Sequence, residues 1–169
     1  MPKVYTSFPV TLFARPQVTP PADWVEIERG PGNIELPEGQ EYGFRIHNID
    51  DYELRALIKE LAGLAPLVYA NLSENRKITD DGLKELAGLP QLTTLNLSSC
   101  GLTSEGIPHL KALTRLHTLD ISFCNRLTGP TLRALRLMPS LRSLNLQGCV
   151  KITNGDVARF NRPDVALKK

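Results

Sequence analysis

The stretch LTTLNLSSCGLTSEGIPHL, residues 92–110, decides the fold because three other stretches of the chain repeat its pattern. The four copies open at leucines spaced by 25, 24 and 25 residues: Leu67, Leu92, Leu116 and Leu141. A fixed period in this range indicates one structural unit that is copied and stacked. We therefore expect a repeat array, whose long and regular surface usually holds another molecule.

Within each copy, the spacing of the apolar residues changes from that of a strand to that of a helix. Ala70 and Leu72 of copy 1 are two residues apart, as on one face of a strand, whereas Leu83 and Leu86 are three apart, as on a helix. A threonine stands before each helical segment, where its hydroxyl is a good N-cap: Thr79, Thr103, Thr128 and Thr153. Each copy is therefore predicted to form a short strand, a tight turn and a short helix.

These residues resemble the leucine-rich repeat family, and within it the cysteine-containing, GALA-like branch with the consensus L-x-x-L-x-L-x-x-C-x-x-I-T-D-x-G-L. The two halves of this consensus are matched by Leu92, Leu95, Leu97 and Cys100, and by Ile78, Thr79, Asp80, Gly82 and Leu83. The resemblance covers residues 64–160. It implies a curved α/β solenoid with a parallel concave sheet and convex helices, used for protein–protein recognition. Copy 3 has Gly129 and Pro130 at the acidic positions, so we expect less regular helices in the last two copies.

At 169 residues the chain suits one domain, for which we predict four segments. Residues 1–22 are proline-rich and are predicted as an extended arm. Residues 23–63 are predicted as an N-terminal cap, in which three alternating runs form a β-hairpin or meander. Phe44, Ile46 and Ile49 then fill the strand and turn positions of a degenerate repeat, and Asp50 caps a helix that runs to about Ala62.

Residues 64–160 are predicted to form the four repeats, and residues 161–169 a C-terminal tail. This tail is too short for a capping repeat, and Pro163 prevents the last helix from continuing far. The strand at residues 143–147 is then an open edge, unless the tail or another chain covers it.

Three cysteines occupy one position of the repeat: Cys100, Cys124 and Cys149. Their odd number and their spacing argue against a disulfide framework. Strands stack at about 4.8 Å, so the outer two thiols would be about 10 Å apart, which is too far for a shared zinc ion. We predict no metal site and interpret the cysteines as buried residues that seal the turn, with Asn75 in that role in copy 1. Free buried thiols are typical of the cytoplasm.

The sequence indicates no catalytic site and no cofactor. Its three histidines fall in a cap strand, a convex helix and a strand edge, so they do not converge: His47, His109 and His117. Motifs for nucleophilic, metal or phosphate chemistry are missing from the sequence. There is no apolar run of about 18 residues and no signal peptide pattern, so we expect no membrane partner. We predict a protein that is not an enzyme.

The outward positions of the four predicted strands form three ladders. They consist of Tyr69, Thr94, Thr118 and Ser143; of Asn71, Asn96, Asp120 and Asn145; and of Ser73, Ser98, Ser122 and Gln147. This face is small, polar and nearly neutral. Its Asn and Ser side chains either bind a partner or satisfy one another across the strands.

Aromatic residues and arginine dominate binding energies at interfaces, and few occur here. Phe123 takes a turn position at which the other copies have Glu74, Ser99 and Gly148, so we expect it to be exposed. One basic row stands directly before the Ile or Leu of the turn and consists of Lys77, Arg126 and Lys151. A second row on the opposite rim consists of Arg115, His117 and Arg142. The candidate partner-binding residues are Tyr69, Asn96, Asp120, Phe123, Arg126, Arg142, Asn145, Gln147 and Lys151.

Charge divides the chain into two parts. Residues 1–113 carry 10 Lys and Arg against 15 Asp and Glu, whereas residues 114–169 carry 10 against 3. The basic end either prevents edge aggregation or binds an acidic partner or a second copy. Nucleic-acid binding is disfavoured, because aromatic residues for base stacking are scarce there.

We therefore predict a cytoplasmic interaction module that binds a protein through the concave sheet and its rims. One alternative is a self-assembling structural or adaptor subunit that joins copies head-to-tail or through an edge strand. The GALA-like resemblance implies a second alternative, an adaptor that receives substrates for a ubiquitin ligase. That role needs an F-box ahead of the repeats. Leu36-Pro37-Glu38 resembles the start of an F-box only weakly.

Overall fold

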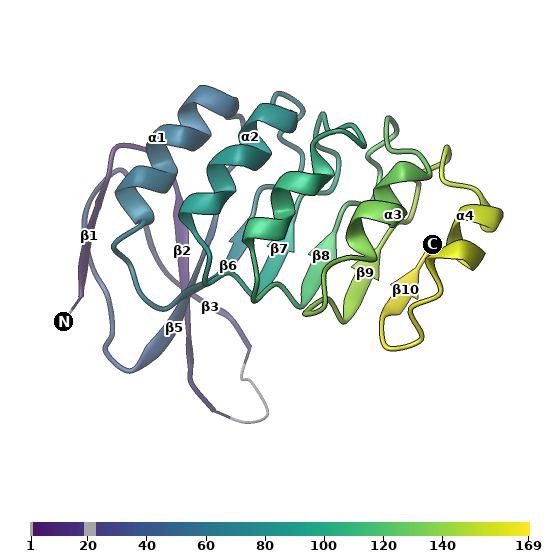
Figure 1. The fold of residues 1–169 in the computed structure, drawn as a ribbon. Helices are drawn as coiled ribbons and strands as arrows, with labels where there is room; N and C mark the ends of the chain where they lie inside the picture. The colour runs from purple at the N-terminus through teal and green to yellow at the C-terminus, as the bar shows by residue number, and fades with distance from the viewer. Residues whose placement is uncertain (1, 19–22) are drawn as a thin grey trace.

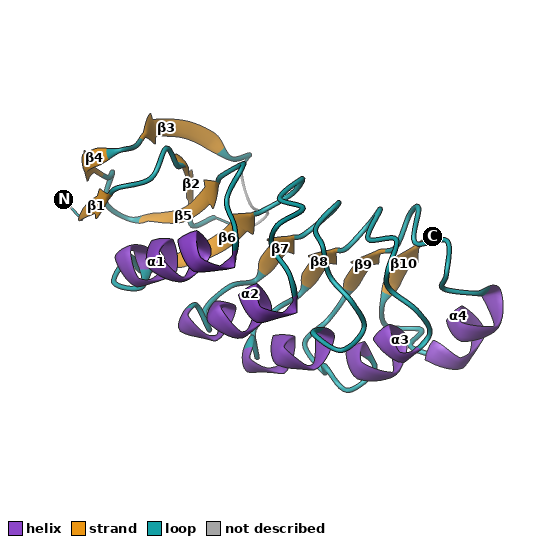
Figure 2. Ribbon diagram, turned by 90° about the horizontal axis from the view of Figure 1, so that it is seen from above, coloured by secondary structure: helices purple, strands orange, loops and turns teal. Residues whose placement is uncertain are grey.

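A computed structural model describes residues 2–18 and 23–169. The strands of the repeats stand side by side in one layer, and the helices cover the other side in a second layer (Figures 1 and 2). The main sheet has the strand order β10-β9-β8-β7-β6-β5-β2-β3. Six of these strands are parallel: β5 (Gln40–Arg45), β6 (Leu67–Asn71), β7 (Thr94–Asn96), β8 (Thr118–Asp120), β9 (Ser143–Asn145) and β10 (Ala166–Lys168).

The parallel sheet and its register confirm the repeat prediction. Tyr69 pairs with Thr94, which pairs with Thr118, which pairs with Ser143. The leucines between the ladders are fully buried in a continuous core that runs from one end of the array to the other. Because every unit buries its apolar face against its neighbours, the array is stable only as a stack.

The helix layer is irregular in copy 2, contrary to the prediction that the last two copies have the less regular helices. It consists of α1 (Asp51–Leu61), α2 (Asp80–Glu85), α3 (Pro130–Leu135) and α4 (Asn154–Phe160), with 3-10 segments η1 (Leu86–Gly88) and η2 (Ile107–Ala112). Thr79 and Thr153 cap α2 and α4 as expected. Thr103 Oγ1 accepts from Glu105 N at 3.3 Å but begins no α-helix, and the N-cap prediction was wrong for Thr128. Copy 2 forms η2 in place of an α-helix, and α3 begins after Gly129 with proline at its first position.

The N-terminal end differs from the predicted meander and arm. β2 (Thr11–Pro16) lies between β5 and β3 (Val25–Arg29) and is antiparallel to both. β1 (Lys3–Thr6) pairs with β4 (Gly32–Glu35) in a separate two-stranded sheet. The three alternating runs are strands, but they do not pair consecutively. Residues 2–18 of the predicted arm are part of the fold. Their apolar residues Val10, Leu12 and Ala14 are buried in the core. Residues 19–22 of that arm lie outside the described residues.

The C-terminal tail covers the last repeat strand. β10 pairs with β9 in the same parallel register as the repeats, with Ala166 opposite Ser143 and Lys168 opposite Asn145. Arg162 holds the tail in place by donating to the main-chain oxygens of Arg136, Met138 and Leu141 at 3.1–3.2 Å. Its side chain also pairs with Asp164 at 2.7 Å. The new edge strand β10 ends in Lys168 and is followed by Lys169, and such charges discourage further pairing.

Candidate interaction surface

The turns that follow the strands share one unusual backbone conformation. The residue before each turn Asn or Cys has a positive φ, and so does the matching residue of the cap: Asn48 (61°), Glu74 (66°), Ser99 (58°), Phe123 (58°) and Gly148 (70°). Glycine and asparagine adopt this region readily, whereas a bulky side chain there is an outlier that costs about 1–2 kcal/mol. Phe123 therefore shares this strained conformation with Glu74 and Ser99, and it has the largest side chain of the row.

Phe123 is also exposed, as its turn position predicts. Its side chain is 56% exposed, and its ring lies over the next turn, where a Cβ added to Gly148 would meet Phe123 Cδ1 at 2.4 Å. The following turn exposes Val150 to 78%, next to the exposed Lys151. The Arg126 guanidinium donates to the main-chain oxygen of Gly101 at 3.3 Å and is otherwise solvated. We call this group of apolar and basic residues, Phe123, Arg126, Val150 and Lys151, the C-terminal rim.

The central ladder is largely satisfied by its own chain. Each Asn or Asp oxygen accepts a hydrogen bond from the main-chain N–H two residues later, at 2.9–3.1 Å, from Asn71 to Asn145. Asp120 also accepts from Ser122 Oγ at 2.6 Å and from Asn145 Nδ2 at 2.8 Å. The candidate residues Asn96, Asp120 and Asn145 lie in this ladder. Because they bond within the chain, few of their polar atoms remain for a partner.

The basic residue on the opposite rim is also engaged. Arg142 donates to the main-chain oxygens of Pro139 and Leu141 at 2.6 and 2.8 Å and lies 3.5 Å from Asp164. These contacts give Arg142 a role in holding the loop before β9. Gln147, in contrast, is half-buried beside the C-terminal rim, and its main-chain oxygen accepts from Phe123 N at 2.7 Å.

At the N-terminal end of the strand face, Tyr69 belongs to an aromatic group that sequence analysis missed. Its ring stacks on Trp24 with centroids 5.3 Å apart and meets Phe13 edge-on at 6.4 Å. Arg15 lies 4.3 Å above the Trp24 ring, and Arg45 lies 5.4 Å above Phe13. Trp, Tyr and Arg are the residue types that dominate binding at interfaces. We call these five residues the aromatic end.

The aromatic end depends on the insertion of β2 beside β5, which brings Phe13 and Arg15 next to Tyr69. Gly43 allows the close approach, because a Cβ there would lie 2.5 Å from Tyr69 Cδ1. Arg15 is held by Glu41 at 2.8 Å. A sequence signal was present in the single tryptophan just before an alternating run, but its neighbours are distant in the chain and could not be inferred from it.

The three cysteines are buried and serve the joints between units. Each sulfur lies 3.1–3.3 Å from a main-chain oxygen of the preceding copy: Cys100 on Leu72, Cys124 on Leu97 and Cys149 on Ile121. Burial raises the pKa of Cys100 and of Cys124 to about 12, so both stay neutral thiols. Among residues 2–18 and 23–169, no group of three or more His, Cys, Asp or Glu side chains is arranged to hold a metal ion.

Comparisons with known proteins place these repeats in a known class. Family models described as leucine-rich repeats match residues 67–87 and, in two copies, residues 90–134. These stretches are therefore leucine-rich repeats, a type of domain that generally mediates protein–protein interaction, and no catalytic family is indicated. The search of curated proteins found no match. No helix in the described part of the chain has the length and apolar content needed to span a bilayer.

A solved structure shows the same fold. A chain from the crystal structure of the Rad7 and Elc1 complex in yeast superposes with a TM-score of 0.61 at 22% sequence identity. The match covers 73% of this chain but 31% of that chain, so the present protein spans about a third of its structural relative. At this identity, the likeness shows the fold alone.

Proposed function

We propose that this chain is a non-enzymatic interaction module that binds a partner protein across the concave strand face, with its main anchors at the two ends of that face. The proposal is carried by Phe123, a large apolar side chain that is exposed and held in a left-handed backbone conformation. The left-handed conformation is shared by the matching residues of the other turns, which include Glu74 and Ser99. What distinguishes Phe123 is that a large apolar side chain stands at this exposed position, where the neighbouring units have Ser99 and Gly148.

The remaining candidate residues take graded roles in this proposal. Phe123, Arg126 and Lys151 form a basic and apolar anchor, to which Gln147 is adjacent, and Tyr69 contributes through the aromatic end. Asn96, Asp120 and Asn145 shape the floor between the anchors. Arg142 acts indirectly by fixing the last loop. Because the C-terminal rim is basic, the partner surface that meets it is acidic.

The test separates binding from stability by using backbone strain. A partner is first captured from native lysate, and its affinity is then measured by calorimetry for the parent chain and for Phe123→Gly. Glycine relieves the strained φ, so Phe123→Gly should melt no lower than the parent. It should nevertheless bind the partner at least tenfold more weakly, because the anchor is lost.

Ser99→Gly is the matched control, because Ser99 has the same φ of 58° in the preceding turn. It should leave partner affinity unchanged. Arg126→Glu should weaken binding and reduce its dependence on salt. If Phe123→Gly and Arg126→Glu both bind the partner as tightly as the parent, the C-terminal rim is not the binding surface.

Self-assembly through the sheet edges is the second candidate function. The two outermost strands are both charged, with Glu26 and Glu28 on β3 and Lys168 on β10, and they run in the same direction. A parallel head-to-tail contact would therefore pair opposite charges. Light scattering across concentration and salt tests it, and a monomer under all conditions removes it. The ubiquitin-ligase adaptor role and the GALA-like assignment stay predictions, and residues 23–46 form strands where that role needs an F-box.

A further inference from the structure

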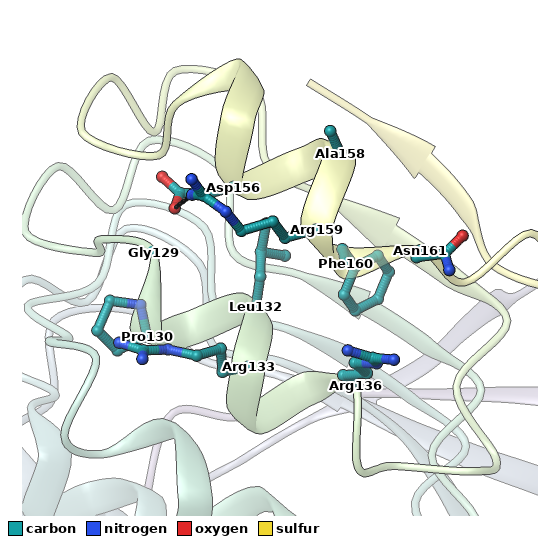
Figure 3. A pocket seen from close by; sticks show the side chains of 10 residues that line it. All are labelled: Gly129, Pro130, Leu132, Arg133, Arg136, Asp156, Ala158, Arg159, Phe160 and Asn161. Carbon is teal, nitrogen blue, oxygen red and sulfur yellow. Dashed lines mark ion pairs between the residues drawn. The ribbon is translucent and has the colours of Figure 1, made fainter.

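The helix face contains a groove between α3 and α4, on the side of the molecule opposite the strand face (Figures 1 and 3). Its volume is about 730 Å³, which lies in the range of sites that hold small ligands or a few side chains. Both helices contribute to its lining: Gly129, Pro130, Leu132, Arg133, Arg136, Asp156, Ala158, Arg159, Phe160 and Asn161. The groove is independent of the C-terminal rim and of the aromatic end.

Among the described residues, the groove lies at the joint that lacks the side-chain hydrogen bond by which the start of one helix segment is linked to the next unit. Asp51 accepts from Thr79 of the next unit, and Asp80 accepts in the same way from Thr103. In the third joint, Ser104 Oγ accepts from Thr128 N at 2.9 Å.

In the fourth joint, the matching position is Gly129, which has no side chain to offer. Thr153 pairs instead with Asp156 of its own helix, at 2.6 and 2.9 Å. A Cβ at position 129 would lie 2.5 Å from Asp156 Oδ1. The start of α4 is thus set by Asp156 rather than by a link to α3, and α4 departs from the direction shared by α1, α2 and α3 (Figure 1).

The groove carries an excess of positive charge. Arg133, Arg136 and Arg159 surround it, and Asp156 is its single carboxylate. Asp156 Oδ2 is occupied by Thr153, and Oδ1 lies 3.6 Å from Arg159. Within the described residues, the guanidinium groups of Arg133 and Arg136 have no hydrogen bond or ion pair, and both residues are exposed. Two arginines are therefore available to bind carboxylates with paired N–H groups.

The floor of the groove is apolar. Leu132 and Phe160 are buried beneath it, and Pro130 and Ala158 form exposed walls. An inorganic anion would use the arginines but not this floor. A nucleic acid needs exposed aromatic rings for its bases, whereas Phe160 is 4% exposed. A peptide segment that combines acidic residues with an apolar side chain complements both the charge and the exposed apolar walls, Pro130 and Ala158, above that floor.

We propose that the α3–α4 groove is a second docking site, which binds an acidic peptide segment of a partner protein and inserts an apolar side chain from it between the two helices. The two faces of the array would then bind two different partners or two parts of one. This site does not rest on the function proposed for the strand face.

The probe is a capped, fluorescently labelled octapeptide of Asp and Glu with a central Leu-Phe pair, and binding is measured by fluorescence anisotropy with the full chain. The parent should bind it, and binding should weaken as salt is raised. A peptide with Ser-Ser in place of Leu-Phe should bind at least tenfold more weakly. Absence of binding by the parent overturns the proposal, and so does equal binding of the two peptides.

Two double variants with the same change in net charge locate the site. Arg133→Glu with Arg136→Glu should weaken peptide binding at least tenfold, whereas Lys111→Glu with Arg115→Glu, at exposed positions outside the groove and the C-terminal rim, should leave it nearly unchanged. Ala158→Trp, which fills the groove without altering charge, should also abolish binding and serves if the charge variant folds poorly. Equal loss in both double variants would mean a diffuse attraction to the basic half. Equal affinity for single-stranded RNA would indicate a surface that binds any polyanion. Either result would overturn the peptide site.

Discussion

At its N-terminal end the repeat array is closed by apolar burial, whereas at its C-terminal end it is closed by a polar clamp. The N-terminal end adds three strands to the sheet, a second small sheet and the longest helix, α1, all joined to one core. The C-terminal end adds β10, which Arg162 holds by hydrogen bonds to main-chain oxygens. Of residues 161–169, Val165 alone is buried, so the tail depends more on the hydrogen bonds of Arg162 than on apolar burial. We therefore expect the N-terminal end to unfold with the rest of the molecule and the C-terminal end to open locally.

The largest effect should come from removing the same aromatic side chain at each end. Phe44→Ala at the N-terminal end should lower the free energy of unfolding by about 4 kcal/mol, because Phe44 is fully buried between sheet and helix. Phe160→Ala should cost about 3 kcal/mol or less, because α4 can move to fill the space. Denaturation followed by Trp24 fluorescence and by circular dichroism measures both. Equal losses would contradict the comparison.

The joint between the cap and the first repeat should be stronger than the joints between repeats. Asn75 accepts from Ile49 N at 3.0 Å and donates to the oxygens of Ile46 and Leu72 at 2.9 Å. Asn75→Ala leaves these buried main-chain groups without a hydrogen-bond partner and should lower the free energy of unfolding by about 3 kcal/mol. Cys124→Ala, at the same position of copy 3, is the control and should cost about 1 kcal/mol, since a thiol is a weak donor. Urea denaturation of the two variants measures both losses of stability. A larger loss for Cys124→Ala than for Asn75→Ala would contradict the prediction that the joint at the cap is the stronger one.

Release of the clamp should open one end alone. Arg162→Met keeps the apolar stem and removes every hydrogen bond of the guanidinium, which should cost about 2 kcal/mol of local stability. The amides of Leu146 and Ala166, which bond across β9 and β10, should then exchange faster with deuterium, while those of β2 stay protected. Arg159→Met, whose side chain is 80% exposed, should change neither. Equal deprotection of β2 would show that the two ends unfold together.

The smallest effect should appear in acid. The hydrogen bond from Arg162 lowers the pKa of Asp164 from 3.8 to about 2. A depressed pKa means that Asp164 stabilises the folded end above pH 3.8, and that this contribution is lost as the pH falls toward 2. The difference in Ala166 protection between the parent and Asp164→Asn should therefore be present at pH 6 and vanish near pH 2. A constant difference at every pH would exclude the carboxylate as its source.

The sequence predicted the middle of the molecule better than its ends. Local periodicity defines the strands from Leu67 onward, and the position of Phe123 in the turn was sufficient to predict its exposure. The pairing of β2 with β5 is not local, so no periodicity in residues 11–16 could show that Phe13 would meet Tyr69. Arg162 looked like one more surface charge, because its acceptors are main-chain oxygens that the sequence does not display. The sequence shows Gly129 at the position where copy 1 has Asp80. It does not show the groove, because that depends on Asp156 bonding to Thr153 of its own helix.

The pairing of β10 with β9 has a consequence for protein engineering. Nine C-terminal residues after Phe160, with little helix-forming capacity, supply a strand that continues the parallel register of the array. The last repeat therefore already accepts a successor with correct geometry. A designer could exchange residues 161–169 for a consensus unit and move the arginine clamp to the new terminus, which would lengthen the array without redesigning its interior.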